Sequence, residues 1–426
     1  MKKVYQKHWT TILAVVALLL GGILFRLWFI GLAPQPMIGD QTEYEWYAGK
    51  IFSHPYLLAS FSYRSYPYSL FLALVYKLVG FGNHQVIFFL QAVLDEIVGY
   101  MVYATILHAL KREKAAWIGF ILYTFNPFTS GYVGVVLSEV LSIFFITATI
   151  LCGMLFVQKP TFLKGLLLGL AAGLTAETRN AAFAWAAIPL GLAFFSFARP
   201  VAFPKLDVWK YVGAGLVGVL LTVLYPLYVN WRDYREINIT TVDSIFAREF
   251  WNGAVFRRLP PFSKNLQIPG LEAMYLEYYS ERHPGRTTEE RQAIANKYVN
   301  KTLAIISADP MDYLRVRLDK MWYVWQKENI FFYEEPGFES HRMVTYWGNI
   351  AILAMALLGV LFWPKLQPQK VKPFEANFLR WSIIGTMLYG TLAFSITHAE
   401  YRLTIPFYPL LILSASVWLD GLGGRA

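Results

Sequence analysis

Long apolar stretches alternate with short polar connections through most of this chain. Several stretches run for about 20 residues with almost no charge, which is enough for a helix to cross a hydrocarbon layer of about 30 Å. The pattern predicts about ten spanning helices. They are expected at residues 9–33, 85–110, 115–133, 138–157, 164–178, 181–197, 209–231, 346–363, 378–397 and 403–419.

Two longer polar segments, residues 34–84 and 232–345, interrupt the predicted helices. The first contains an apolar run over residues 66–80 that carries Lys77 and is short for a span, so it predicts an amphipathic helix on the membrane surface. The second is long enough for a small domain. Residues 287–327 within it have helical spacing and begin with a capping pattern at Thr287 and Glu290. The expected divisions are a transmembrane module (1–231), a loop domain (232–345) and C-terminal spans (346–426).

Composition supports lipid as the solvent. Hydrophobic residues make up 56% of the chain and charged residues 15%, with a mean hydropathy of +0.40. The predicted fold class is therefore an all-α polytopic membrane protein. Cys152 is the single cysteine, which excludes an internal disulfide framework and a cysteine zinc site.

The distribution of charge predicts the orientation. If the N-terminus is inside, the two chain ends and the short loops on the cytoplasmic side hold 16 basic and 4 acidic residues. Segments 34–84 and 232–345 together hold 19 of each. The positive-inside rule then places both termini in the cytoplasm and both long segments outside a cell inner or plasma membrane. The net charge of +10 is thus explained by topology, and no nucleic-acid partner is expected.

Many ionisable residues fall at one level of this topology, the outer rim of the membrane. A carboxylate there could accept the proton of an attacking hydroxyl group, and arginines could hold a phosphate by paired hydrogen bonds. Ion pairs that merely close the helix ends are the alternative. The rim residues are Asp40, Glu43, Arg64, Glu139, Glu177, Arg179, His398, Glu400 and Arg402.

The run Gly39-Asp40-Gln41-Thr42-Glu43-Tyr44, directly after the first predicted span, resembles the acidic signature of the GT-C superfamily of glycosyltransferases. The likeness is to the bacterial branch related to protein O-mannosyltransferases and the lipid A aminoarabinose transferase. Arg64-Ser65-Tyr66-Pro67-Tyr68 is similar to the basic residue, proline and membrane-parallel helix of that family. Further similar motifs follow in family order at Asn126-Pro127, Ser138-Glu139, residues 169–180, residues 309–314 and Glu400-Tyr401-Arg402.

The resemblance implies a GT-C-like fold and an inverting glycosyltransferase that uses a polyprenyl-phosphate sugar donor at the extracytoplasmic face. The acceptor would be a glycolipid, a glycan or a protein. Asp40 would be the catalytic base. The residues expected to bind substrate are Glu43, Arg64, Tyr66, Glu139, Arg179, His398, Glu400 and Arg402. No cofactor is assigned, and a divalent cation stays open because His341, His398 and scattered acids could bind one, although no metal-ligand spacing occurs.

Two other functions stay open. A secondary transporter would use the intramembrane acids Asp95 and Glu96 as an ion path, although an arginine or backbone partner inside the bundle is the favoured interpretation of those acids. A ligase or polymerase of lipid-linked glycans would place catalysis in the large outside loop instead of the first one. A substitution at Asp40 separates the two enzymes.

Overall fold

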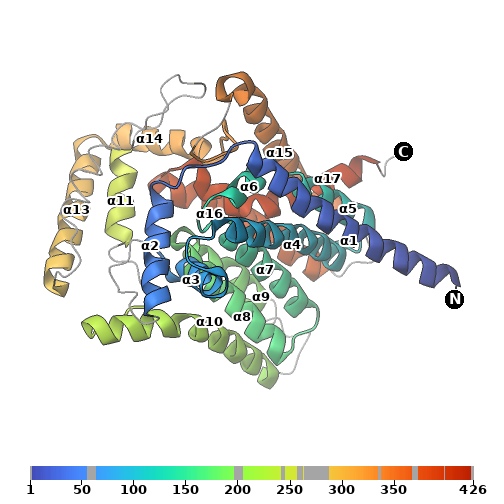
Figure 1. Ribbon diagram of the computed structural model, residues 1–426, viewed down its shortest axis with the longest axis horizontal. Helices are drawn as coiled ribbons and strands as arrows, with labels where there is room; N and C mark the ends of the chain where they lie inside the picture. Colours follow the sequence, from blue (N-terminus) through green and yellow to red (C-terminus); the bar gives the residue numbers. More distant parts are fainter. Residues whose placement is uncertain are drawn as a thin grey trace.

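The computed structural model describes residues 2–54, 64–195, 205–240, 245–256, 262, 287–333, 337–366, 373–397 and 399–423. Within these ranges the regular structure is entirely helical and no strand occurs, which confirms the predicted all-α class (Figure 1). The first half contains α1 (Lys2–Gly31), α2 (Asp40–Ser53), α3 (Tyr66–Val79), α4 (His84–Leu110), α5 (Glu113–Thr124), α6 (Pro127–Ser130), η1 (Gly131–Gly134), α7 (Glu139–Gln158), α8 (Phe162–Thr178), η2 (Asn180–Ala182), η3 (Ala184–Ala186), α9 (Ala187–Phe195) and α10 (Lys205–Tyr234). The second half contains α11 (Ile245–Val255), α13 (Thr288–Ala308), α14 (Pro310–Tyr323), α15 (Phe338–Leu366), α16 (Pro373–Ile396), η5 (Tyr401–Phe407) and α17 (Tyr408–Gly423).

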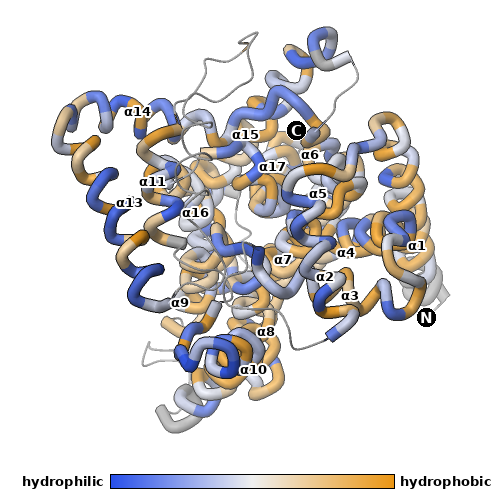
Figure 2. The backbone as a smooth tube through the Cα atoms, turned by 60° about the vertical axis from the view of Figure 1, so that its left-hand side comes forward, coloured by the Kyte–Doolittle hydropathy of each residue, from blue (hydrophilic) through white to orange (hydrophobic). Residues whose placement is uncertain are grey.

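Six helical segments among the described residues are long and apolar enough to cross a membrane, as in a multi-pass membrane protein. They are Trp9–Gly31, His84–Leu110, Glu139–Gln158, Trp209–Tyr234, Glu339–Lys365 and Tyr401–Gly423. Along α1, the side chains of Leu13, Leu20, Leu24 and Trp28 are each more than half exposed and repeat at helical spacing. Such a stripe is unfavourable in water and suits contact with lipid. Figure 2 shows the contrast between the apolar α1 and the polar α13.

Two predicted spans are interrupted in the structure. The segment predicted as one helix at 115–133 ends at Thr124, because the Asn126 side chain accepts a hydrogen bond from the backbone of Phe128 and starts the short α6 at Pro127. The segment predicted at 181–197 begins with the short turns η2 and η3 before α9. Both interruptions place backbone turns beside the start of α7 and the end of α8, where candidate site residues lie.

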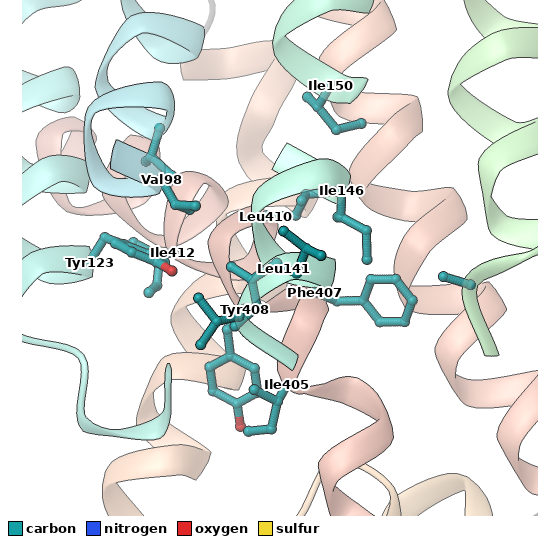
Figure 3. Close-up of a cluster of buried hydrophobic side chains, with 14 of the residues drawn as sticks. Val98, Tyr123, Leu141, Ile146, Ile150, Ile405, Phe407, Tyr408, Leu410 and Ile412 are labelled. Atoms are coloured by element: carbon teal, nitrogen blue, oxygen red, sulfur yellow. The ribbon is translucent and has the colours of Figure 1, made fainter. Parts of the chain in front are cut away.

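The core of the bundle lies between α4, α5, α7 and α17. Figure 3 shows Val98 of α4, Tyr123 of α5, Ile146 of α7 and Tyr408 of α17 in one buried cluster. Elsewhere, α8 and α10 approach closely because glycines face each other, and a Cβ atom at Gly169 would overlap the carbonyl oxygen of Gly215. This packing fixes the C-terminal end of α8, which carries Arg179.

A buried ionic cluster joins α1 to α4. The Arg26 guanidinium donates to Asp95 Oδ2 at 2.6 Å and to Glu96, and all three side chains are fully buried. Tyr123 donates its hydroxyl to Asp95 at 2.6 Å, and the hydroxyl of Thr124 donates to Glu96 at 2.8 Å. The prediction that the two intramembrane acids have an arginine or backbone partner inside the bundle is thus confirmed, and the partner is Arg26.

The large loop contributes α11, α13 and α14, which lie together on the left side of Figure 1. Thr287 and Glu290 form the predicted capping box at the start of α13. The helix predicted over 287–327 is divided, because Asp309 ends α13 and caps α14, which starts at Pro310. Trp251, Phe256 and Tyr298 form a small apolar cluster of their own, so α11 and α13 pack as a unit.

Cysteine labelling in intact cells tests the orientation. With Cys152 replaced by alanine, single cysteines at the exposed positions Thr42 in α2 and Gln292 in α13 are expected to react with an impermeant reagent. A cysteine at the exposed Lys114, in the first turn of α5, should react only after the cells are opened. Protection of the first two positions, or labelling of the third in intact cells, would contradict the predicted topology.

Candidate active site

Most of the predicted site residues line one cavity of about 450 Å³. Its walls come from α2, the residues before α3, the start of α7, the turns after α8, α11, α16 and the residues before α17. The predicted residues that line it are Asp40, Arg64, Glu139, Arg179, Glu400 and Arg402. Segments far apart in the sequence thus bring both signs of charge to one site of ligand size.

Asp40 is placed by the start of α2. The chain turns at Gly39, which has a φ of 58° and precedes the first helical residue. Gln41 then fixes this turn, because its amide donates to the Pro36 carbonyl at 2.6 Å and accepts a hydrogen bond from the Val136 backbone at 2.7 Å. A carboxylate in the first turn of a helix is also favoured by the helix dipole.

The Asp40 carboxylate lies between two guanidinium groups. Arg402 contacts its Oδ2 at 2.7 Å, and Arg64 contacts its Oδ1. Burial raises the pKa of the Asp40 carboxyl, but Arg402 and Arg64 outweigh this effect and hold that pKa below its usual value. Each arginine also binds a second acid, since Arg64 Nε lies 2.7 Å from Glu43 and Arg402 pairs with Glu400. In this state Asp40 is ionised at neutral pH and held as an acceptor.

Aromatic rings support both arginines. The Arg64 guanidinium lies 5.5 Å from the ring centre of Tyr44, whose hydroxyl donates to Ser138 at 3.0 Å. The Arg402 guanidinium lies 4.6 Å from the ring centre of Phe332. The two cations are therefore oriented before any ligand binds.

Buried Lys327 stabilises the segment that carries Arg402. Its side-chain nitrogen donates to the Val324 carbonyl at 2.9 Å and to the Thr404 hydroxyl at 2.8 Å. Burial lowers the pKa of Lys327 well below its ordinary value. Because Thr404 and Arg402 both belong to η5, these bonds tie the position of the arginine to the end of the large loop.

A second ion pair lies on the same cavity wall. Glu139, the first residue of α7, forms an ion pair with Arg179 at 2.8 Å, and both side chains are largely buried. Arg179 follows the last residue of α8. The ends of two helices thus contribute one more cation and one more carboxylate.

The other predicted residues lie differently. Glu43 contacts Arg64 but does not line the cavity. Tyr66 is buried outside the cavity lining, where its hydroxyl donates to the Thr222 carbonyl at 2.7 Å and its ring lies 4.6 Å from that of Tyr225. His398 lies outside the described residues. Within the described part of the chain, no group of three or more His, Cys, Asp or Glu side chains is arranged to hold a metal ion.

The cavity also has a contribution from α11 that the sequence did not predict. Arg248, Glu249 and Asn252 of this helix line the cavity together with Phe246. Arg248 contacts Glu249 at 2.8 Å. The available signal was weak: three polar positions within one turn and a half of an otherwise apolar helix in a loop of mixed charge.

The rim of the cavity is apolar and exposed. Phe183, Ile239 and Phe246 line it with exposed fractions of 44%, 42% and 70%. Exposed apolar groups beside a charged interior suit an amphiphile with a polar head and a hydrocarbon tail. In chemical terms the site offers a carboxylate that can accept a proton and cations that can bind an anion.

Comparison with protein-family models finds no match to this chain, and comparison with curated proteins finds no significant match.

Proposed function

We propose that this protein is an inverting glycosyltransferase that takes a sugar from a polyprenyl-phosphate donor at the extracytoplasmic face of the membrane. The observation that supports this most strongly is the cavity itself, where Asp40 lies against Arg64 and Arg402 with Arg179 on the same wall. Arginine suits a phosphate because its planar group donates paired hydrogen bonds. The exposed apolar rim supplies a place for the lipid tail.

The chemistry follows from these groups. The acceptor hydroxyl attacks the anomeric carbon from the face opposite the phosphate, the bond from that carbon to the phosphate oxygen breaks, and Asp40 takes the hydroxyl proton. Polyprenyl phosphate leaves with an additional negative charge that the arginines stabilise. Because Arg64 and Arg402 hold Asp40 in the free protein, a bound phosphate would compete for them and make the carboxylate a stronger base.

The proposal also includes the finer predictions for the fold, the acceptor and a metal ion. The chain would have a GT-C-like arrangement of about ten spans, with α3 on the membrane surface and the loop domain outside. The acceptor would be a glycolipid, a glycan or a protein. Binding of a divalent cation at the site stays open.

The transporter alternative has less support. Asp95 and Glu96 would have to serve an ion path, but Arg26, Tyr123 and Thr124 already bind their carboxylates inside the bundle. Such a network of buried ion pairs and hydrogen bonds favours a structural role. The ligase alternative uses the same class of donor but a different catalytic base. Replacing Asp40 by asparagine therefore distinguishes the glycosyltransferase from the ligase.

The arginines give a direct test of donor binding. Replacing Arg64 or Arg402 by lysine keeps the charge and removes the planar pair of donors, and replacing either by alanine removes both. Loss of charge-assisted hydrogen bonds worth about 1.5–3 kcal/mol is expected to weaken polyprenyl-phosphate binding by about 10-fold or more in the alanine variants. Binding would be measured with the protein in lipid nanodiscs.

Arg112 provides the matched control for this test. It also forms an ion pair, with Asp420 at 2.5 Å, but does not line the cavity. The variant Arg112→Ala should therefore bind polyprenyl phosphate normally. Wild-type affinity in Arg64→Ala, Arg179→Ala and Arg402→Ala alike would show that these arginines are structural.

A further inference from the structure

Asn252 is a buried polar residue on the cavity wall. Only 2% of its surface is exposed, and its Oδ1 has no hydrogen-bond partner among the described residues. The residue nevertheless lines the cavity. Most buried amides are paired, so an unpaired acceptor on a residue that lines a cavity marks a place where a ligand could supply the missing donor.

The position of Asn252 is fixed by its neighbours. The next residue, Gly253, packs so closely on the end of α16 that a Cβ atom there would overlap the carbonyl oxygen of Ile396. The Gly253 carbonyl in turn accepts hydrogen bonds from Arg317 and from Lys320, the latter at 2.5 Å. On another face of α11, Trp251 packs against Tyr298 with ring centres 5.4 Å apart. Contacts on both sides of Asn252 therefore hold it in place, as a recognition residue requires.

The chemistry of the unpaired atom limits what it can bind. An amide oxygen only accepts hydrogen bonds, so its ligand must present a donor. A phosphodiester and a polyprenyl chain offer no donor, whereas a sugar ring offers several hydroxyl groups. In the proposed donor the sugar is bonded directly to the phosphate, so its ring must occupy the same cavity as the phosphate near Arg64 and Arg402.

We propose that Asn252 is a specificity-determining residue that accepts a hydrogen bond from a hydroxyl group of the donor sugar. This inference rests on the proposed function, and it assigns part of sugar recognition to α11 of the large outside loop. Arg248 and Glu249 lie one helical turn earlier on the same cavity wall, so they are placed beside the same ring.

The test compares two kinds of ligand in nanodiscs: polyprenyl phosphate alone, and a panel of polyprenyl-phosphate hexoses and pentoses. The protein is the full chain as wild type, Asn252→Leu, which keeps the size, and Asn252→Ala, which cannot clash. Both variants should bind bare polyprenyl phosphate as the wild type does, while their preference for the best sugar-bearing lipid falls about 3- to 10-fold. Asn296→Ala, an exposed asparagine on α13, should leave both affinities unchanged.

The outcomes separate this inference from the proposed function. If the wild type prefers a sugar-bearing lipid and a folded Asn252 variant keeps the full preference, the inference is wrong and the proposed function stands. If the wild type binds no polyprenyl phosphate at all, the proposed function fails and the inference fails with it. Should Asn252→Leu not fold, Asn252→Ala decides the result.

Discussion

Replacing Asp40 by asparagine is expected to lower sugar transfer about 100-fold or more, the usual contribution of a general base. Asparagine keeps the size of the side chain and much of its hydrogen bonding but cannot accept the proton of the attacking hydroxyl. The measurement is transfer from a panel of polyprenyl-phosphate sugars to total membrane glycolipid, with wild type and variant at equal expression. Binding of the donor should survive, because Arg64, Arg179 and Arg402 are unchanged.

Glu43→Gln is the matched control for this variant. Glu43 also forms an ion pair with Arg64, at 2.7 Å, but it lies outside the cavity lining. Its replacement disturbs the same arginine without removing the proposed base, so a much smaller loss is expected. Near-normal turnover in Asp40→Asn would remove Asp40 from the mechanism and favour a ligase whose base lies in the large loop.

The sequence was sufficient to predict that the charged site residues gather, and one cavity brings six of them together, but their pairing was not predicted. Asp40, Arg64 and Arg402 each stand next to a predicted helix end, and hydropathy together with charge bias predicts the same side of the membrane for all three. Which acid meets which arginine depends on how α2 turns at Gly39 and how η5 is held by Lys327. These contacts join distant parts of the chain, and no local pattern reports them.

The contribution of α11 could not be predicted for a related reason. Asn252 reaches the cavity because Gly253 allows close contact with the end of α16. In the sequence, Asn252 is one polar residue in a long loop of mixed charge. Its importance emerges only when its burial and its unpaired oxygen are known together.

The predicted helix ends are wrong where local turn chemistry competes with hydropathy. The apolar pattern continues through Asn126 and Pro127, yet the helix stops because asparagine caps a new turn and proline cannot donate a backbone hydrogen bond. The same competition divides the large-loop helix at Asp309 and Pro310. Hydropathy thus predicts which segments prefer lipid more reliably than where each helix ends.

The buried cluster of Arg26, Asp95 and Glu96 leads to the second large expected effect, which concerns stability rather than activity. Replacing Arg26 by methionine keeps much of the side-chain volume but leaves both carboxylates without their cation. Removing one partner of a buried ion pair costs about 3–5 kcal/mol, because the remaining charge is uncompensated in a medium of low dielectric constant. The variant should therefore unfold at clearly lower temperature or denaturant concentration in detergent.

A triple variant distinguishes an unpaired charge from a mere loss of packing. Adding Asp95→Asn and Glu96→Gln to Arg26→Met removes the carboxylates that had lost their partner, while Tyr123 and Thr124 can still donate to the new amide oxygens. Most of the lost stability should return, since replacing a whole buried ionic cluster by neutral groups is often close to neutral. Sugar transfer by the triple variant should also approach the wild-type rate, because Arg26, Asp95 and Glu96 do not line the cavity. A triple variant that is stable but inactive would instead show that the buried acids serve the function, as a transporter or proton relay requires.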